Sequence, residues 1–103
     1  MLENPINFVE VAGQLTQIDA IRYTPAGVAL LSAQLAHQSV QLEAGLKRVI
    51  EQNFKCRFAG KLADQVSRLS LGSHIKVRGF LASAKRGSMS LIVHVQELEF
   101  GDL

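Results

Sequence analysis

The sequence predicts a small, mostly β domain in which one short helix interrupts a series of five strands. Through most of the chain, apolar residues alternate with polar ones, which is the period of a strand with one buried face. Between residues 61 and 71 the period changes to that of an amphipathic helix. A chain of 103 residues has room for one modest core, so we expect a single domain over residues 1–103.

The first strand is predicted over residues 6–18, where apolar side chains keep one parity and polar side chains the other. Gly13 within it favours a bulge or a sharp bend. A tight turn follows. Pro25 fixes the φ angle that suits the second position of a β-turn, and Gly27 accepts backbone angles that residues with a Cβ resist.

Two further strands are predicted over residues 28–37 and 48–59, each with apolar side chains on one face. The connection between them, residues 38–47, is ambiguous, and we interpret it as a wide hairpin loop. Cys56 lies on the apolar parity between two phenylalanines, which indicates an unreactive core residue.

The helix is predicted over residues 61–71, where leucine and valine recur at i, i+4 and i+7, and Gly72 is its predicted stop. Period-two alternation returns over residues 73–83 and again over 89–98. The short loop between these two strands, residues 84–88, is basic.

A single helix between the third and fourth of five strands is the arrangement of the OB-fold, a five-stranded Greek-key barrel. Gly13, Gly60 and Gly79 stand where strands of such a barrel must bend. Closing the sheet also removes most of its exposed edge. An open α+β sheet is the alternative that the pattern leaves open.

Charge is distributed unevenly along the chain, although the net charge is only +2. Ten of the eleven basic residues fall within residues 47–86, where only Glu51 and Asp64 oppose them, which gives this segment a charge of +8. Residues 1–46 and 87–103 each carry −3. The asymmetry favours a polyanion as partner, and simple solvation of outer strand faces is the alternative.

The sequence argues against several other classes of protein. No apolar run approaches the roughly 18 residues that span a membrane, and the N-terminus lacks a secretory signal. One cysteine cannot form an internal disulfide, and the three histidines lack metal-ligand spacing. No nucleophile motif or phosphate-binding loop is found. We therefore expect a cytoplasmic binding protein with no catalytic activity, no metal or other cofactor and no small-molecule substrate.

Several stretches resemble known bacterial proteins. Residues 22–27, Arg-Tyr-Thr-Pro-Ala-Gly, resemble the first hairpin of bacterial single-stranded-DNA-binding proteins, and residues 58–63 and 71–81 resemble their strand–helix–strand passage. Residues 35–45, Leu-Ala-His-Gln-Ser-Val-Gln-Leu-Glu-Ala-Gly, discriminate further. They resemble the second strand and following loop of the primosomal replication protein N (PriB) family, and the resemblance covers nearly the whole chain.

The resemblance implies a homodimer that binds single-stranded DNA and takes part in the restart of stalled replication forks. In that family the protein contacts the PriA helicase, which it would stimulate or recruit, and other primosome proteins. A conventional single-stranded-DNA-binding protein is disfavoured because no long tail with an acidic tip follows. A protein-interaction module with little DNA affinity of its own remains the alternative, and RNA binding stays open.

Single strands bind through cations that contact phosphates and through rings that stack on bases. Four cations on the parity opposite the core are expected to line one outer sheet face: Lys55, Arg57, Lys76 and Arg78. Arg22 and Lys85 match basic positions of the family. The full set of predicted nucleic-acid-binding residues is Arg22, Tyr23, Lys47, Arg48, Lys55, Arg57, Lys76, Arg78, Phe80, Lys85 and Arg86.

Two departures from the family pattern concern affinity. The chain has no Trp, and Glu51 falls about where the best-known member of the family has a stacking Trp. Gln38 replaces a basic residue in the loop after the second strand. Stacking is therefore expected from Tyr23 or Phe80, and each lost stack forgoes about 1–3 kcal/mol.

Overall fold

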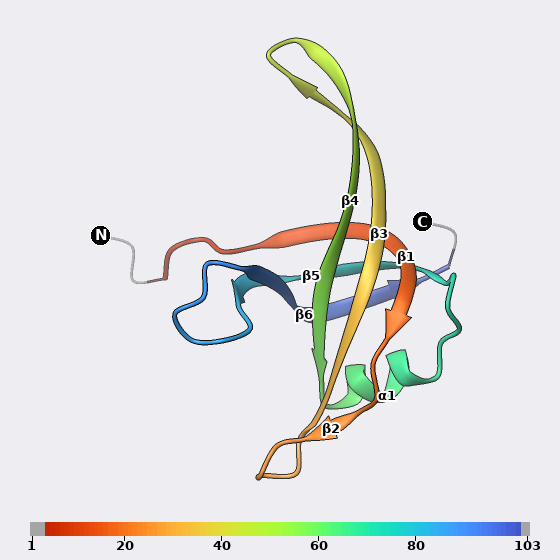
Figure 1. The fold of residues 1–103 in the computed structure, drawn as a ribbon, viewed down its shortest axis with the longest axis vertical. Helices are drawn as coiled ribbons and strands as arrows, with labels where there is room; N and C mark the ends of the chain where they lie inside the picture. Colours follow the sequence, from red (N-terminus) through yellow and green to blue (C-terminus); the bar gives the residue numbers. More distant parts are fainter. Residues whose placement is uncertain (1–3, 102–103) are drawn as a thin grey trace.

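The computed structural model describes residues 4–101, so the two ends of the predicted domain, and part of the N-terminus on which the absence of a signal was predicted, lie outside the described residues. Five long strands and one helix follow one another along the chain in the predicted order, and there is one additional strand of two residues. The elements are β1 (Val9–Ile18), β2 (Arg22–Tyr23), β3 (Ala29–Glu43), β4 (Leu46–Ala59), α1 (Lys61–Ser67), β5 (His74–Ser83) and β6 (Leu91–Phe100) (Figure 1).

The strands form one sheet that closes on itself. Their order is β1-β5-β6-β4-β3-β2, and β1 pairs with β3 as well as with β5. The first half of β1 pairs with β5 and the second half, from Gln14 onward, pairs with β3. This double pairing closes the five long strands into a barrel. The predicted OB-fold is confirmed, and the open α+β sheet is excluded.

The core lies inside the barrel on the parities that the sequence predicts. Its largest fully buried side chains include Leu15, Leu31, Leu35, Phe58, Ile75 and Val77. Cys56 is fully buried among them, and burial raises the pKa of its thiol to about 12. The thiolate is therefore not formed at neutral pH, in agreement with the prediction of an unreactive residue.

The predicted turn after the first strand is confirmed, although it joins β2 to β3. The amide of Gly27 donates to the carbonyl of Thr24 at 2.8 Å, and Gly27 has a φ of +86°. Pro25 therefore occupies the second position of this turn, as expected.

The prediction of a wide loop at residues 38–47 is wrong. Strands β3 and β4 continue as an unbroken ladder to the pair Glu43–Leu46, and only Ala44 and Gly45 form the turn. Both turn residues have positive φ, 53° and 77°, as a two-residue hairpin loop requires. The hairpin consequently projects well beyond the barrel (Figure 1).

The helix is shorter than predicted, because it ends at Ser67 rather than near residue 71. The next two amides, of Arg68 and Leu69, donate to carbonyls three residues back, which tightens the last turn. Gly72 is therefore not the helix stop; it lies in the turn before β5, where its amide donates to the carbonyl of Leu15 at 2.7 Å.

Two register shifts bend the barrel strands. In β1 the bulge lies between Leu15 and Gln17, not at Gly13 as the sequence suggested. In β5 the shift lies at Gly79, as expected for a bend there. A Cβ built on Gly79 would lie 1.9 Å from the carbonyl oxygen of His94, so only glycine fits between β5 and β6 at this point.

Candidate nucleic-acid interface

The outer face of β3 and β4 carries a groove of about 150 Å³. On this face Ser32 pairs with Arg57, and Gln34 pairs with Lys55. The end of β1 forms one side of the groove, and β6 with the start of the β5–β6 loop forms the other. The lining residues are Gln17, Asp19, Ser32, Ala33, Gln34, Lys55, Cys56, Arg57, Ala84 and Ile92.

Arg57 lies beside two stacked rings. It is the register partner of His94 across β4 and β6, and His94 is in turn the partner of Phe80 across β6 and β5. The rings of Phe80 and His94 are parallel within 4°, with their centroids 4.9 Å apart. Sequence parity placed Phe80 outside the core, and the structure shows that its neighbour there is another ring.

Two polar atoms at this junction have no partner within the part of the chain that the structure describes. They are Nε of Arg57 and Nε2 of His94, and both are buried. Buried polar atoms in folded proteins are nearly always hydrogen-bonded. The two atoms are therefore unusual in having no internal hydrogen bond at this junction.

The remaining predicted residues lie around this groove or away from it. Lys85 and Arg86 are exposed on the loop that starts at Ala84, a residue of the groove wall. Arg22 and the largely exposed Tyr23 lie on β2, beside the start of β3. Lys47 and Arg48 lie near the hairpin tip, where Arg48 forms an ion pair with Glu43.

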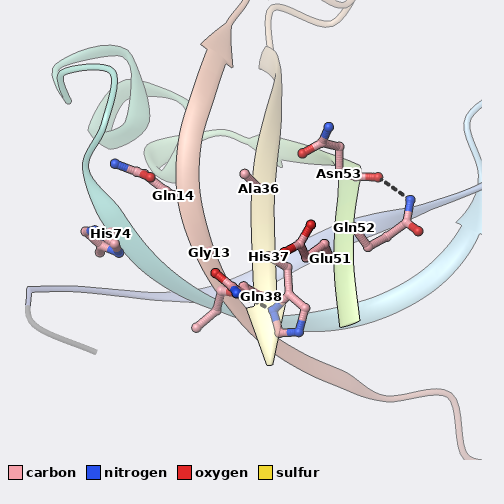
Figure 2. A pocket seen from close by; sticks show the side chains of 10 residues that line it. Gly13, Gln14, Ala36, His37, Gln38, Glu51, Gln52, Asn53 and His74 are labelled. Atoms are coloured by element: carbon pink, nitrogen blue, oxygen red, sulfur yellow. Dashed lines mark hydrogen bonds between the residues drawn. The ribbon is translucent and has the colours of Figure 1, made fainter. Parts of the chain in front are cut away.

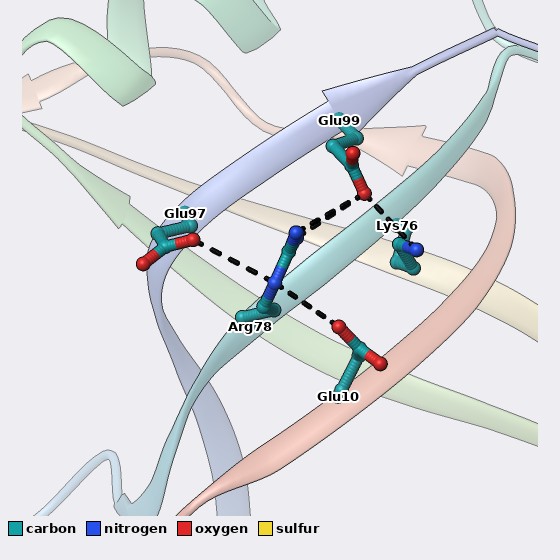
Figure 3. A network of polar contacts seen from close by, with 5 residues as sticks. All are labelled: Glu10, Lys76, Arg78, Glu97 and Glu99. Carbon is teal, nitrogen blue, oxygen red and sulfur yellow. Dashed lines mark hydrogen bonds and ion pairs between the residues drawn. The ribbon is translucent and has the colours of Figure 1, made fainter.

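The prediction that Lys55, Arg57, Lys76 and Arg78 line one face is wrong in its grouping. All four lie on the outward parity, but β6 stands between β4 and β5 and contributes carboxylates that pair with the two cations of β5. Figure 3 shows this network: Arg78 contacts Glu10, Glu97 and Glu99 at 3.0–3.6 Å, and Lys76 lies 3.0 Å from Glu99.

The network forms a surface on which negative charges slightly outnumber positive ones. The hydrogen bond and positive charge of Lys76, with the charge of Arg78, lower the pKa of Glu99, so this carboxylate is ionised at neutral pH. Three carboxylates therefore face two cations on this part of the barrel. Such a surface offers a polyanion little attraction.

Comparisons with known proteins show to which family the chain belongs. The profile of a family described as "Another single-strand binding protein family" matches residues 7–97. The replication restart protein PriB of Nitrosomonas europaea is 36% identical over 91 residues, which are 88% of this chain and 84% of that protein. The chain belongs to the PriB family. PriB of Neisseria meningitidis is 31% identical over 93 residues, covering 90% of this chain and 92% of that protein.

Solved structures agree with this PriB assignment. The structure of priB from Ralstonia solanacearum has a TM-score of 0.86 and 31% identity, and the match covers 95% of this chain and all of that one. The single-stranded DNA binding protein from Thermus aquaticus has a TM-score of 0.73 and 28% identity, over 94% of this chain and 50% of that chain. The fold is thus shared by PriB and by single-stranded-DNA-binding proteins.

The two departures from the PriB pattern lie together in the structure. Gln38 and Glu51 are register partners on the hairpin, and both line a wide depression of about 690 Å³ beside β1 (Figure 2). Its lining has one carboxylate, several amides and two histidines, but no Lys, Arg, Phe, Tyr or Trp. This depression therefore offers a phosphate no Lys or Arg side chain in this member of the PriB family.

Sequence reasoning missed His94 and the polar side chains of the groove floor. Alternation did place His94 opposite the buried Val93 and Val95, so its outward direction was available. Its contact with Phe80 was not, because only the register of β5 on β6 puts the two rings side by side. None of the helices among the described residues is long and apolar enough to cross a membrane.

Proposed function

We propose that the chain is a single-stranded-DNA-binding accessory protein of the replication-restart primosome. The groove on β3 and β4 is the observation that carries the proposal, because two cations line it and one of them, Arg57, is the register partner of His94 in the stacked pair of rings. The names of its relatives, replication restart protein and single-stranded DNA binding protein, support the same function. The protein acts in the cytoplasm by binding alone, and it stimulates or recruits the PriA helicase.

In this proposal the single-stranded DNA lies across the groove. Lys55 and Arg57 contact its phosphates and base edges, and Phe80 contributes stacking. Lys85 and Arg86 hold the strand from the adjoining loop, a position that OB-folds use for oligonucleotides. Flanking contacts come from Arg22, Tyr23, Lys47 and Arg48. Lys76 and Arg78 contribute least, because carboxylates already hold them.

Fluorescence anisotropy tests the proposal. A labelled oligonucleotide of about thirty nucleotides is titrated at several salt concentrations, with duplex DNA and RNA of the same length as controls. We expect preference for single-stranded DNA and a log–log salt slope of about −2 to −4, for three to five phosphate contacts. No binding at low salt would remove the proposal.

Replacing Lys85 and Arg86 together by Ala is expected to weaken binding about tenfold and to reduce the salt slope by about 1.4, since two phosphate contacts are lost. The matched control is Lys61→Ala with Arg68→Ala, which deletes the same charge from α1 and its C-terminal end. Equal losses in both double variants would show that only net charge matters.

Arg78→Ala is expected to change stability more than binding. Three carboxylates lose their shared cation, and exposed ion pairs contribute about 0–1 kcal/mol each, so we expect a fall of roughly 1 kcal/mol in the free energy of unfolding. Affinity for the oligonucleotide should stay within about twofold. Urea unfolding and anisotropy on the same variant measure both; a tenfold loss of affinity would place the DNA over the network instead.

One observation favours the alternative, a module that contacts the helicase. The projecting hairpin exposes apolar side chains that the barrel does not use, among them Val40, Leu42 and Val49. Val40→Thr with Val49→Thr keeps β-branched residues and removes apolar surface. Under this alternative the double variant loses stimulation of PriA unwinding while its affinity for DNA is unchanged; under the first proposal stimulation follows DNA affinity.

We also propose a homodimer. Residues 9–13 of β1 pair with β5 on one side, and β3 covers the other side only from Gln14 onward. This leaves part of a strand edge available to a second copy. Light scattering should give twice the chain mass of 11.2 kDa. A mass of one chain at micromolar concentration would contradict the proposal.

A further inference from the structure

Phe8, just before β1, lies near the pair of stacked rings on β5 and β6 by the register of the sheet. The amide side chain of Asn7 bonds to both backbone groups of Leu81, at 2.8 and 2.9 Å, so the chain before β1 still follows β5. Val9 pairs with Gly79 in the antiparallel ladder. Extended by one residue beyond the printed end of this ladder, the same register sets Phe8 opposite Phe80, which is stacked on His94.

Parity directs Phe8 outward. Val9 packs against the core, and successive residues along an extended chain point to opposite sides. Phe8 is accordingly 64% exposed. His94 covers one face of the Phe80 ring, because the two rings are parallel within 4° with their centroids 4.9 Å apart. An exposed phenyl ring offers a nucleic-acid base a flat apolar surface on which it can stack.

The stacked rings adjoin the cationic groove. His94 is the register partner of Arg57, whose Nε is buried without a partner in the described part of the chain, as is Nε2 of His94. The rings of Phe80 and His94 are thus followed across the sheet by the cation of Arg57. Single-strand sites combine these two elements, aromatic platforms for bases and cations for the backbone.

We propose that Phe8, Phe80 and His94 form the base-stacking platform of this protein, in place of the Trp that the chain lacks. The inference rests on the proposed function, since it names the residues that hold the bases of a bound single strand. The bases stack on Phe8 and on the face of Phe80 that His94 does not cover, while His94 supports Phe80 from behind. The strand then passes to Arg57 and Lys55 in the groove.

A single introduced Trp tests the platform directly. The chain contains no Trp, so Phe8→Trp creates the only one. We expect oligo(dT) to quench its fluorescence with the same midpoint as the anisotropy titration. Phe100→Trp is the matched control, because Phe100 is 51% exposed and lies opposite Ile75, away from the stacked rings. Its fluorescence should not respond to oligo(dT).

Affinity supplies the second measurement. Phe8→Ala and Phe80→Ala should each weaken binding at least about fivefold. Their salt slopes should match that of the wild type, because no phosphate contact is removed. Circular dichroism checks that each variant is folded. Because Phe8 lies outside the core, Phe8→Ala alone tests the platform if Phe80→Ala is unstable.

The outcomes separate this inference from the proposed function. If the wild type binds single strands but Phe8→Ala binds within twofold and Phe8→Trp is not quenched, the platform is wrong and the function stands. If Phe8→Trp responds to protein concentration rather than to oligo(dT), Phe8 is a contact between two copies and the platform is likewise overturned. If the wild type binds no single strand, both proposals fail.

Discussion

Replacing Lys55 and Arg57 together by Ala should lower the affinity for a single-stranded oligonucleotide by about 100-fold or more. Hydrogen bonds to charged groups contribute about 1.5–3 kcal/mol each, and about 1.4 kcal/mol corresponds to a factor of ten. Both side chains line the groove, and the Nε of Arg57 has no partner in the described residues. Anisotropy at two salt concentrations measures the loss.

The single variant Arg57→Lys refines this prediction. Lysine keeps the charge of Arg57 but lacks its planar fork of donors. We therefore expect Arg57→Lys to bind the oligonucleotide more tightly than the double Ala variant but less tightly than the wild type, with the salt slope of the wild type. Lys61→Ala with Arg68→Ala again controls for charge. Wild-type affinity in Lys55→Ala with Arg57→Ala would show that the strand does not use this groove.

Gly79→Ala should destabilise the barrel by roughly 3 kcal/mol, at the upper end of the cost of overpacking. The added Cβ would lie 1.9 Å from the backbone oxygen of His94 and 3.0 Å from Cα of Val95, so β5 and β6 must move apart. Phe80 and His94 flank this point, and oligonucleotide binding should weaken as their stacking is disturbed. Urea unfolding followed by circular dichroism gives the stability.

Gly87→Ala is the control for Gly79→Ala. Nothing lies within 4 Å of a Cβ at Gly87, and its φ of +81° alone makes alanine unfavourable, by about 1–2 kcal/mol. Because Gly87 is in the β5–β6 loop, the rings should keep their stacking. Equal destabilisation in the two variants would mean that the close approach at Gly79 relaxes freely.

Sequence alone predicted the elements of the barrel because each strand has one buried face. The parity that buries Leu31 and Phe58 is visible without any partner strand. The length of the β3–β4 hairpin was predicted wrongly for the same reason. Beyond the barrel both faces of β3 and β4 meet solvent, so alternation disappears, and Ala44-Gly45 is not one of the common Asn-Gly or Asp-Gly turn sequences.

The candidate site was predictable residue by residue, but not as an arrangement. Composition identified the cations, and parity turned them outward. Whether a cation is available depends on its neighbours across the sheet, and the register of β5 on β6 places Glu97 beside Arg78 but His94 beside Phe80. Lys55 and Arg57 have the same parity as Lys76 and Arg78, yet only the first pair lines a groove.

We propose that single-stranded DNA lies on the β3–β4 groove and the adjoining rings. A ¹H–¹⁵N chemical-shift titration of the whole chain with oligo(dT) tests it most directly. We expect the largest changes at the amides of Lys55, Arg57 and His94 and in the loop that carries Lys85. Changes concentrated instead around Glu51 in the wide depression, or at the carboxylate network of Arg78, would contradict it.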